Sequence, residues 1–354
     1  MIKIDLNSIK SIKDCIKFLH FAICKNVRET ISSQISESKV LSKSKGKGDV
    51  SYFLDIKAEN IITSFFNKAI FDGTITVVSE GIGCKTYKKG DFSSAKITII
   101  VDPIDGTREI MYDKRSAWVL TGIIMNSNNN TLKDIDVAIQ TEIPPTKQKY
   151  FSYLYAIRKQ GAFEEIWNAD DFDMVRKPRK ISASKSTVLQ DGFVSFVNFF
   201  PGSKAEIAEI TELFFENSIG RVGENNALVF DDQYISTGGQ IYLLATGKYR
   251  MVVDIRSLLE KYMASKNKAL GLCAHPYDLC TFLLCQEAGG VISRVSGDKF
   301  DISLNTDINV DWIGFSNQEL FDKYQGLLWD IIKKYLTHKS TSLGILSSHV
   351  SNSL

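Results

Sequence analysis

The chain has 354 residues, of which 44% are hydrophobic and 11% aromatic. This composition supplies a sizeable core for one large domain or for two of ordinary size. Its 43 basic and 41 acidic side chains leave a formal charge of only +2, which gives no reason to expect binding to nucleic acid or to a membrane surface. No apolar run reaches the roughly 18 to 20 residues that cross a bilayer, and the N-terminal segment lacks a signal-peptide pattern. We therefore expect a soluble, cytoplasmic protein.

The cysteines and histidines do not follow the spacing of a zinc site, and no CxxC pair occurs. We expect reduced and mostly buried thiols at positions 15, 24, 84, 273, 280 and 285. One dense basic run, from Lys39 to Lys47, also carries serine and glycine. That mixture favours a mobile, solvated loop over a nucleic-acid patch.

Two helices and two strands are predicted in the first third of the chain. Apolar residues spaced three and four apart predict an amphipathic helix from Ser8 to about Ser36, and a second helix runs from about Leu54 to Ala69. The period then changes in two β-branched runs, ITVVSE ending at Glu80 and AKITIIVDPID beginning at Ala95. Such runs predict strands that end at a loop.

The remaining pattern divides the chain into two parts. Strands are predicted at 117–125, 135–141, 150–158, 192–198, 218–222 and 249–255, and helices at 203–217, 239–246 and 277–288. The first half thus predicts helices on a large, mostly antiparallel sheet, and the second a smaller α/β unit. We expect an N-terminal part over 1–185, a C-terminal part over 186–335, and a flexible, serine-rich tail over 336–354.

The stretch IIVDPIDGTRE is the most informative in the sequence. Asp102 and Asp105 flank a proline that cannot continue a central strand, so both carboxylates can point to one side of a turn. The carbonyl of Ile104 is then freed from the sheet, and the amides of Gly106 and Thr107 can face an anion at a helix start. Cations and a phosphate group could share such a pocket. For an isolated Asp-Pro dipeptide, however, an ordinary turn is the alternative.

Three further acidic positions accompany this motif. Glu80 ends the preceding strand, Asp55 lies in the second helix with Glu59 one turn later, and Asp278 begins a late helix. Mg²⁺ prefers oxygen ligands in octahedral array, so carboxylates with a backbone carbonyl suit it. A solvated strand end is the alternative for Glu80 taken alone.

Three segments resemble the signatures of a known superfamily. VSEG at 78–81, VDPIDGT at 101–107 and PYDLCTFLLCQEAGG at 276–290 are similar to those of the inositol monophosphatase and fructose-1,6-bisphosphatase superfamily of lithium-sensitive, magnesium-dependent phosphatases. Weaker echoes extend the resemblance from about residue 8 to 320. It implies an α/β (α+β) fold, layered as an α/β/α/β/α sandwich with mixed and largely antiparallel sheets.

The resemblance also implies a role for each site residue. The ligands of two or three Mg²⁺ ions would be Glu80, Asp102, the carbonyl of Ile104, Asp105 and Asp278. Gly106 and Thr107 would donate amides to the phosphate, while the Thr107 hydroxyl, with Asp55 behind it, would orient the attacking water. Glu80 is our candidate for the group that accepts the proton of that water.

Departures from the family pattern bear on the substrate. Gly81 replaces the second residue of the usual Glu-Glu pair, and Arg108 and Glu109 stand where small polar residues are usual. Arg108 brings donors to the substrate mouth and hints at a second acidic group on the substrate. The segment after Asp278 is one residue short, and about 15 extra residues, 257–271, precede it. His275 and Tyr277 could line the substrate pocket, although a surface role for His275 is the alternative.

These observations predict a Mg²⁺-dependent phosphomonoesterase that acts on an inositol phosphate, a sugar phosphate or a 3'-phosphonucleotide. The alternative is a weak or inactive metal- and phosphate-binding protein of the same fold. A homodimer is expected from the resemblance alone, and we expect neither a nucleic-acid polymer nor a membrane as partner.

Overall fold

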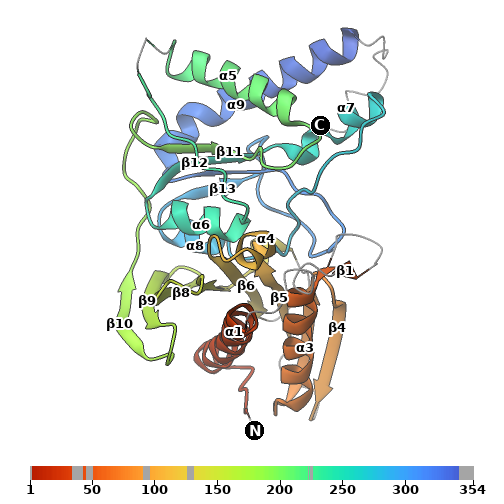
Figure 1. Ribbon diagram of the computed structural model, residues 1–354, viewed down its shortest axis with the longest axis vertical. Helices are drawn as coiled ribbons and strands as arrows, with labels where there is room; N and C mark the ends of the chain where they lie inside the picture. The colour runs from red at the N-terminus through yellow and green to blue at the C-terminus, as the bar shows by residue number, and fades with distance from the viewer. Residues whose placement is uncertain are drawn as a thin grey trace.

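The computed structural model describes residues 2–33, 43–44, 51–90, 96–125, 131–221, 223 and 226–342. Helices and sheets alternate in layers along its longest axis (Figure 1). Among the described residues, the strands form an eight-stranded sheet, a four-stranded sheet and a two-stranded ribbon. No helix of this part of the chain has the length and apolar character needed to span a membrane.

The large sheet has the strand order β10-β9-β8-β7-β6-β5-β3-β4. Its strands are β3 (Gly73–Ser79), β4 (Gly83–Lys89), β5 (Lys96–Asp105), β6 (Ala117–Met125), β7 (Val137–Ile143), β8 (Tyr150–Ile157), β9 (Gly161–Asn168) and β10 (Met174–Lys180). Of these pairs, β3 and β5 are parallel and the others antiparallel, as expected from the sequence. The parallel pair places the ends of β3 and β5 at the same edge of the sheet, beside Glu80 and Asp102.

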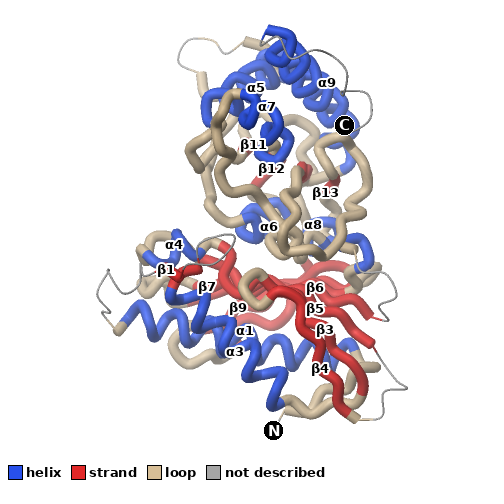
Figure 2. The backbone as a smooth tube through the Cα atoms, turned by 90° about the vertical axis from the view of Figure 1, so that its right-hand side faces the viewer, coloured by secondary structure: helices blue, strands red, loops and turns tan. Residues whose placement is uncertain are grey.

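Helices α1 (Ile9–Ser32) and α3 (Phe53–Lys68) cover one face of this sheet (Figure 2). The buried side of α1 carries Ile12, Ile16 and Leu19, which is the predicted apolar stripe. The helix begins after Ser8, whose side chain accepts a hydrogen bond from the amide of Ser11. The apolar sides of both helices and this face of the sheet form one core.

The opposite face of the large sheet packs against α6 (Thr237–Ala245) and α8 (Leu283–Glu287), which lie between the two sheets. The four-stranded sheet has the order β11-β12-β14-β13. Its strands are β11 (Phe193–Phe196), β12 (Tyr249–Asp254), β13 (Val291–Ser293) and β14 (Trp312–Phe315). The middle helices thus share a core with both sheets.

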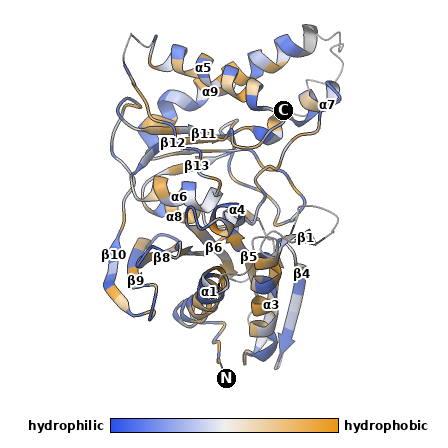
Figure 3. Cartoon of the chain, viewed as in Figure 1, coloured by the Kyte–Doolittle hydropathy of each residue, from blue (hydrophilic) through white to orange (hydrophobic). Residues whose placement is uncertain are grey.

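The outer layer consists of α5 (Lys204–Ser218) and the long α9 (Gln318–Ser342), which pack on the far face of the small sheet. The remaining short elements are β1 (Lys43–Ser44), β2 (Ser51–Tyr52), α4 (Thr107–Met111), α7 (Glu260–Ser265) and the 3₁₀ turns Leu132–Asp134 and Arg256–Leu259. Hydrophobic and hydrophilic residues alternate in bands along the helices of each layer (Figure 3). The predicted layered α/β/α/β/α fold is confirmed.

Several predicted elements differ from those observed. The predicted helix 277–288 is a helix only over α8. Residues 276–282 form tight turns instead, with amide bonds three residues back such as those from Leu279 to Pro276 and from Phe282 to Leu279. No strand forms over the described residues 218–221, where α5 ends at Ser218 and irregular chain follows it. Helix α9 continues past the expected start of the tail to Ser342. Most of the basic run from Lys39 to Lys47, and residues 343–354, lie outside the described residues.

Candidate active site

A bulge at the end of β5 places two aspartates on the same face of the sheet. Asp102 is paired with Leu120 of β6 and Asp105 with Trp118, so three steps along β5 match only two steps along its neighbour. In a regular strand, residues three apart point to opposite faces. The extra residue at the Pro-Ile step restores the same face for both aspartates. The expected convergence of these carboxylates is therefore built by a bulge inside the strand.

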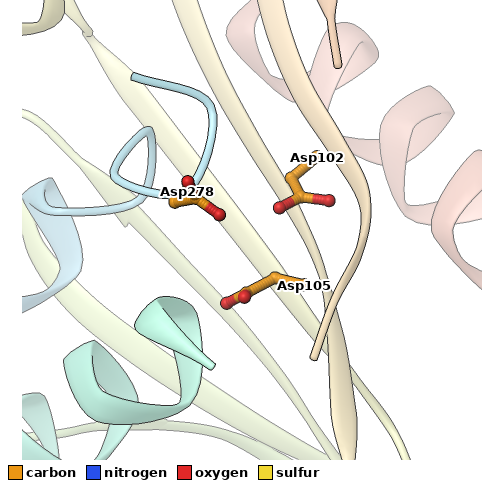
Figure 4. Close-up of side chains that lie close together, drawn as sticks. All are labelled: Asp102, Asp105 and Asp278. Carbon is orange, nitrogen blue, oxygen red and sulfur yellow. The ribbon is translucent and has the colours of Figure 1, made fainter. Parts of the chain in front are cut away.

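Asp278 completes a cluster of three carboxylates from two separate parts of the chain. It lies in the turns that precede α8, and Figure 4 shows its carboxylate facing those of Asp102 and Asp105. One oxygen from each of the three side chains lies within 4.8 Å of the others. The missing residue after Asp278 does not move it away, because the segment adopts turns instead of a continuous helix.

Asp105 is held in place by the first turn of α6. Its Oδ2 accepts hydrogen bonds from the Ser236 hydroxyl at 2.8 Å and from the amide of Gly238 at 2.5 Å. Ser236 also caps the helix by accepting a bond from the amide of Gly239. Asp105 therefore links the large sheet to the helix layer between the sheets.

Contacts with His275 position Asp278. The amide of His275 donates to Oδ2 of Asp278 at 2.6 Å, and Nδ1 of His275 lies 3.6 Å from the same oxygen. The rings of His275 and Tyr277 are stacked, with centroids 5.1 Å apart. His275 is therefore part of the pocket rather than an isolated surface residue.

The cluster is electrostatically suited to a cation. Burial, together with the charges of Asp105, Glu80 and Asp278, raises the pKa of Asp102 well above its usual range. Burial and the charge of Asp278 also raise the pKa of Asp105. Close buried carboxylates repel one another unless they bind protons or a positive charge. Because all the donors are oxygens, a hard divalent cation fits this set.

Thr107 and Asp55 meet beside the cluster. The Thr107 hydroxyl lies 2.9 Å from Oδ1 of Asp55 and 2.7 Å from the carbonyl oxygen of Ile104. The other oxygen of Asp55 accepts from the amide of Tyr52 at the start of α3. Gly106 precedes Thr107 with φ of 94°, a conformation that favours glycine, and an added Cβ would come within 3.2 Å of Ser236.

A single pocket joins the predicted site residues. Its lining includes Glu80, Asp102, Ile104, Asp105, Gly106, Thr107, Arg108, His275, Tyr277 and Asp278, while Asp55 lies behind Thr107. Phe199, Phe200 and Arg256 also line it, and the sequence interpretation missed them. An Asp-x-Arg sequence at the end of a predicted strand was the available signal for Arg256.

Neither a family model nor a curated protein sequence matches this chain. Solved structures do. The IMPase of Thermotoga maritima is 17% identical with a TM-score of 0.56, and the match covers 91% of this chain and 99% of that one. A Pyrococcus horikoshii protein with similarities to inositol-1 monophosphatase is 20% identical with a TM-score of 0.59, covering 90% and 98%. Fructose-1,6-bisphosphatase from Leishmania major is 14% identical with a TM-score of 0.63, covering 92% and 96%.

These matches span nearly the whole of each neighbour and at least 90% of this chain. At such identities the likeness concerns the fold. The chain therefore has the fold of the inositol monophosphatase and fructose-1,6-bisphosphatase superfamily, as its three signature segments predict.

Proposed function

We propose that this protein is a Mg²⁺-dependent phosphomonoesterase that hydrolyses a small phosphorylated metabolite. The observation that carries the proposal is the convergence of Asp102, Asp105 and Asp278 within 4.8 Å, in a pocket that Thr107 also lines. Stability alone gives no reason to gather three carboxylates at one point, two of them buried. The fold, shared with phosphatases such as those of Thermotoga maritima and Leishmania major, supports the same class of reaction.

The metal ligands would be the three aspartates, Glu80 and the carbonyl of Ile104. All five line one pocket, and Glu80 is close enough to raise the pKa of Asp102. Bound divalent cations make water more acidic and neutralise charge on phosphoryl oxygens. The all-oxygen donor set favours Mg²⁺ over zinc, and we propose two or three ions on the resemblance.

The protein's own groups would position the attacking water. Asp55 accepts a hydrogen bond from the Thr107 hydroxyl, which leaves the Thr107 oxygen lone pairs available to accept one from water. Glu80 would accept the proton that this water loses, because a carboxylate beside cations stays ionised. The amides of Gly106 and Thr107 would donate to the phosphate, with Arg108, His275 and Tyr277 contacting the rest of the substrate.

The substrate classes are inositol phosphates, sugar phosphates and 3'-phosphonucleotides. A neighbouring structure, described as SaIMPase-II with 2'-AMP bound, makes a nucleotide worth testing beside the sugars. We further propose a cytoplasmic homodimer whose chain is divided into parts 1–185 and 186–335.

The test is phosphate release from a panel of the three substrate classes, measured with Mg²⁺, with a chelator and with added Li⁺. The proposal expects release that requires Mg²⁺ and is inhibited by Li⁺. If no compound of the panel releases phosphate, in protein shown to be folded by circular dichroism, a binding protein of this fold would be favoured.

A further inference from the structure

Two arginines lie close to one aromatic ring in the wall of the pocket. The guanidinium carbon of Arg108 lies 5.3 Å from the ring centroid of Phe200, and that of Arg256 lies 5.8 Å from the same centroid. Arg108 follows the metal motif at the end of β5, whereas Arg256 follows β12 in the other part of the chain. Both side chains line the pocket that holds the aspartate cluster.

Arg256 is buried and rigidly held. Its Nε and Nη2 donate to the two carboxylate oxygens of Asp254 at 2.8 and 2.6 Å, and its Nη1 donates to the carbonyl of Leu272. Only 6% of Arg256 and none of Asp254 is exposed. A buried ion pair of this kind adds little net stability over apolar residues, so its position at a pocket calls for another explanation. The fixed guanidinium is preorganised to bind an anion.

The extra segment 257–271 supports this wall. It begins directly after Arg256 and ends beside Leu272, whose carbonyl accepts from Arg256. A Cβ atom on Gly271 would lie 2.9 Å from the carbonyl oxygen of Pro201 and 3.3 Å from Cβ of Phe200. The segment therefore packs against the loop that carries Phe200, and the wall depends on a part of this chain that the family signatures do not cover.

We propose that Arg108 and Arg256 form an anion subsite, so that the preferred substrate carries a second anionic group besides the phosphate that is cleaved. This inference rests on the proposed phosphatase function. The metal ions and the cleaved phosphate would bind in the same pocket, beside the aspartate cluster. The second group is a phosphate or a carboxylate, since a guanidinium binds both in the same planar geometry.

The experiment uses three compounds that share one phosphate. Glucose 6-phosphate, 6-phosphogluconate and glucose 1,6-bisphosphate carry a hydroxyl, a carboxylate and a second phosphate at carbon 1. We expect kcat/KM to be about tenfold or more higher for at least one dianionic compound than for glucose 6-phosphate, as a charged hydrogen bond allows. The better of the two identifies the chemistry of the second group.

Variants test whether the arginines cause this preference. Arg108→Met should reduce the ratio of the two kcat/KM values by about tenfold, and Arg108→Lys should restore part of it. Arg256→Met alone leaves a buried aspartate unpaired, so the double variant Asp254→Leu/Arg256→Met is used as well and should reduce the ratio similarly. Arg176→Met, on the exposed strand β10, is the matched control and should keep the wild-type ratio.

The outcomes separate the two proposals. Turnover with equal kcat/KM for all three compounds, or a preference that survives both arginine variants, overturns the subsite and leaves the phosphatase intact. If no compound releases phosphate, calorimetric titration in Mg²⁺ decides the matter. Tighter binding of a dianionic compound that Arg108→Met abolishes supports the subsite without turnover, whereas equal affinities or no binding overturn it.

Discussion

The carboxylate of Glu59 lies over the backbone of Gly81, so close that a Cβ atom on Gly81 would come within 1.8 Å of Oε1 of Glu59. Glu59 is on α3, one turn after Asp55, whereas Gly81 follows Glu80 at the end of β3. The family signature has a second glutamate at the position of Gly81. In this chain the side chain of Glu59 fills the room that such a residue would need.

We therefore expect Gly81 and Glu59 to be energetically coupled. Gly81→Ala should cost about 1 kcal/mol of unfolding free energy, because the flexible end of Glu59 must move away. In a Glu59→Ala background, the same change should cost close to nothing. Urea unfolding of the four proteins in this double-mutant cycle measures the coupling, and equal costs in both backgrounds would contradict the contact.

Glu59 should also make the stability of the metal-free protein depend on pH. Burial, and next the charge of Asp55, raise its pKa from 4.5 to about 7. Because the folded state binds the proton more tightly than the unfolded state, Glu59 destabilises the fold increasingly as pH rises from about 4.5 to about 7. In EDTA, Glu59→Gln should be more stable than wild type at pH 8, by on the order of 1–2 kcal/mol for this half-buried group. A difference that stayed constant down to pH 4.5 would exclude this cause.

Thr107→Val tests the proposed catalytic role of the hydroxyl while keeping the shape of the side chain. The hydroxyl contacts Asp55 and the carbonyl of Ile104, and valine keeps the volume while losing both contacts. We expect kcat to fall by about 10²–10⁴-fold, as for loss of a group that positions or transfers a proton. The stability cost should be only about 1 kcal/mol. Thr107→Ser is the control, and an equally large loss of kcat in that variant would mean that the methyl group matters instead.

Gln140 hydrogen-bonds to two segments that carry the site, the start of α6 and the turns before α8. This fully buried side chain on β7 donates to the carbonyl of Gly238 at 2.7 Å and accepts from the Thr281 hydroxyl at 2.9 Å. Gln140→Leu removes the hydrogen-bond partner of both groups. We therefore expect the free energy of unfolding, measured in urea, to fall by about 2–4 kcal/mol and Mg²⁺ binding to weaken. Gln318→Leu, which removes an exposed bond to Asp322, should change stability by less than about 0.5 kcal/mol. Equal effects of the two substitutions would argue against this role.

Local signals predicted the elements that carry a clear period. The apolar stripe of α1 and the β-branched run of β5 each bury the residues that the sequence indicates. Strand β10 could not be found in this way, because all its residues are exposed and show no apolar alternation. The apolar residues in the turns before α8 would fit a buried helix equally well, so periodicity could not distinguish turns from helix there.

The residues of the candidate site that belong to recognisable motifs could be predicted from the sequence. Asp102 and Asp105 are three residues apart in the sequence, and the proline between them signals the irregular strand. Asp278 is far from them in the sequence and joins them only through the tertiary fold. Its place in the site was predicted from the resemblance of its segment to a family signature. Arg256 and Phe200 belong to no signature, and their meeting depends on how segment 257–271 packs, which no local pattern specifies.

The most direct measurement of the central claim is Mg²⁺-dependent phosphate release by wild type and by Asp105→Asn on the best substrate of the panel. Asp301→Asn, an exposed aspartate paired with Lys133, is the matched control. The account predicts activity that a chelator abolishes and Mg²⁺ restores, a loss of orders of magnitude in Asp105→Asn, and wild-type rates in the control. Full activity in folded Asp105→Asn, or turnover that persists in the chelator, would contradict it.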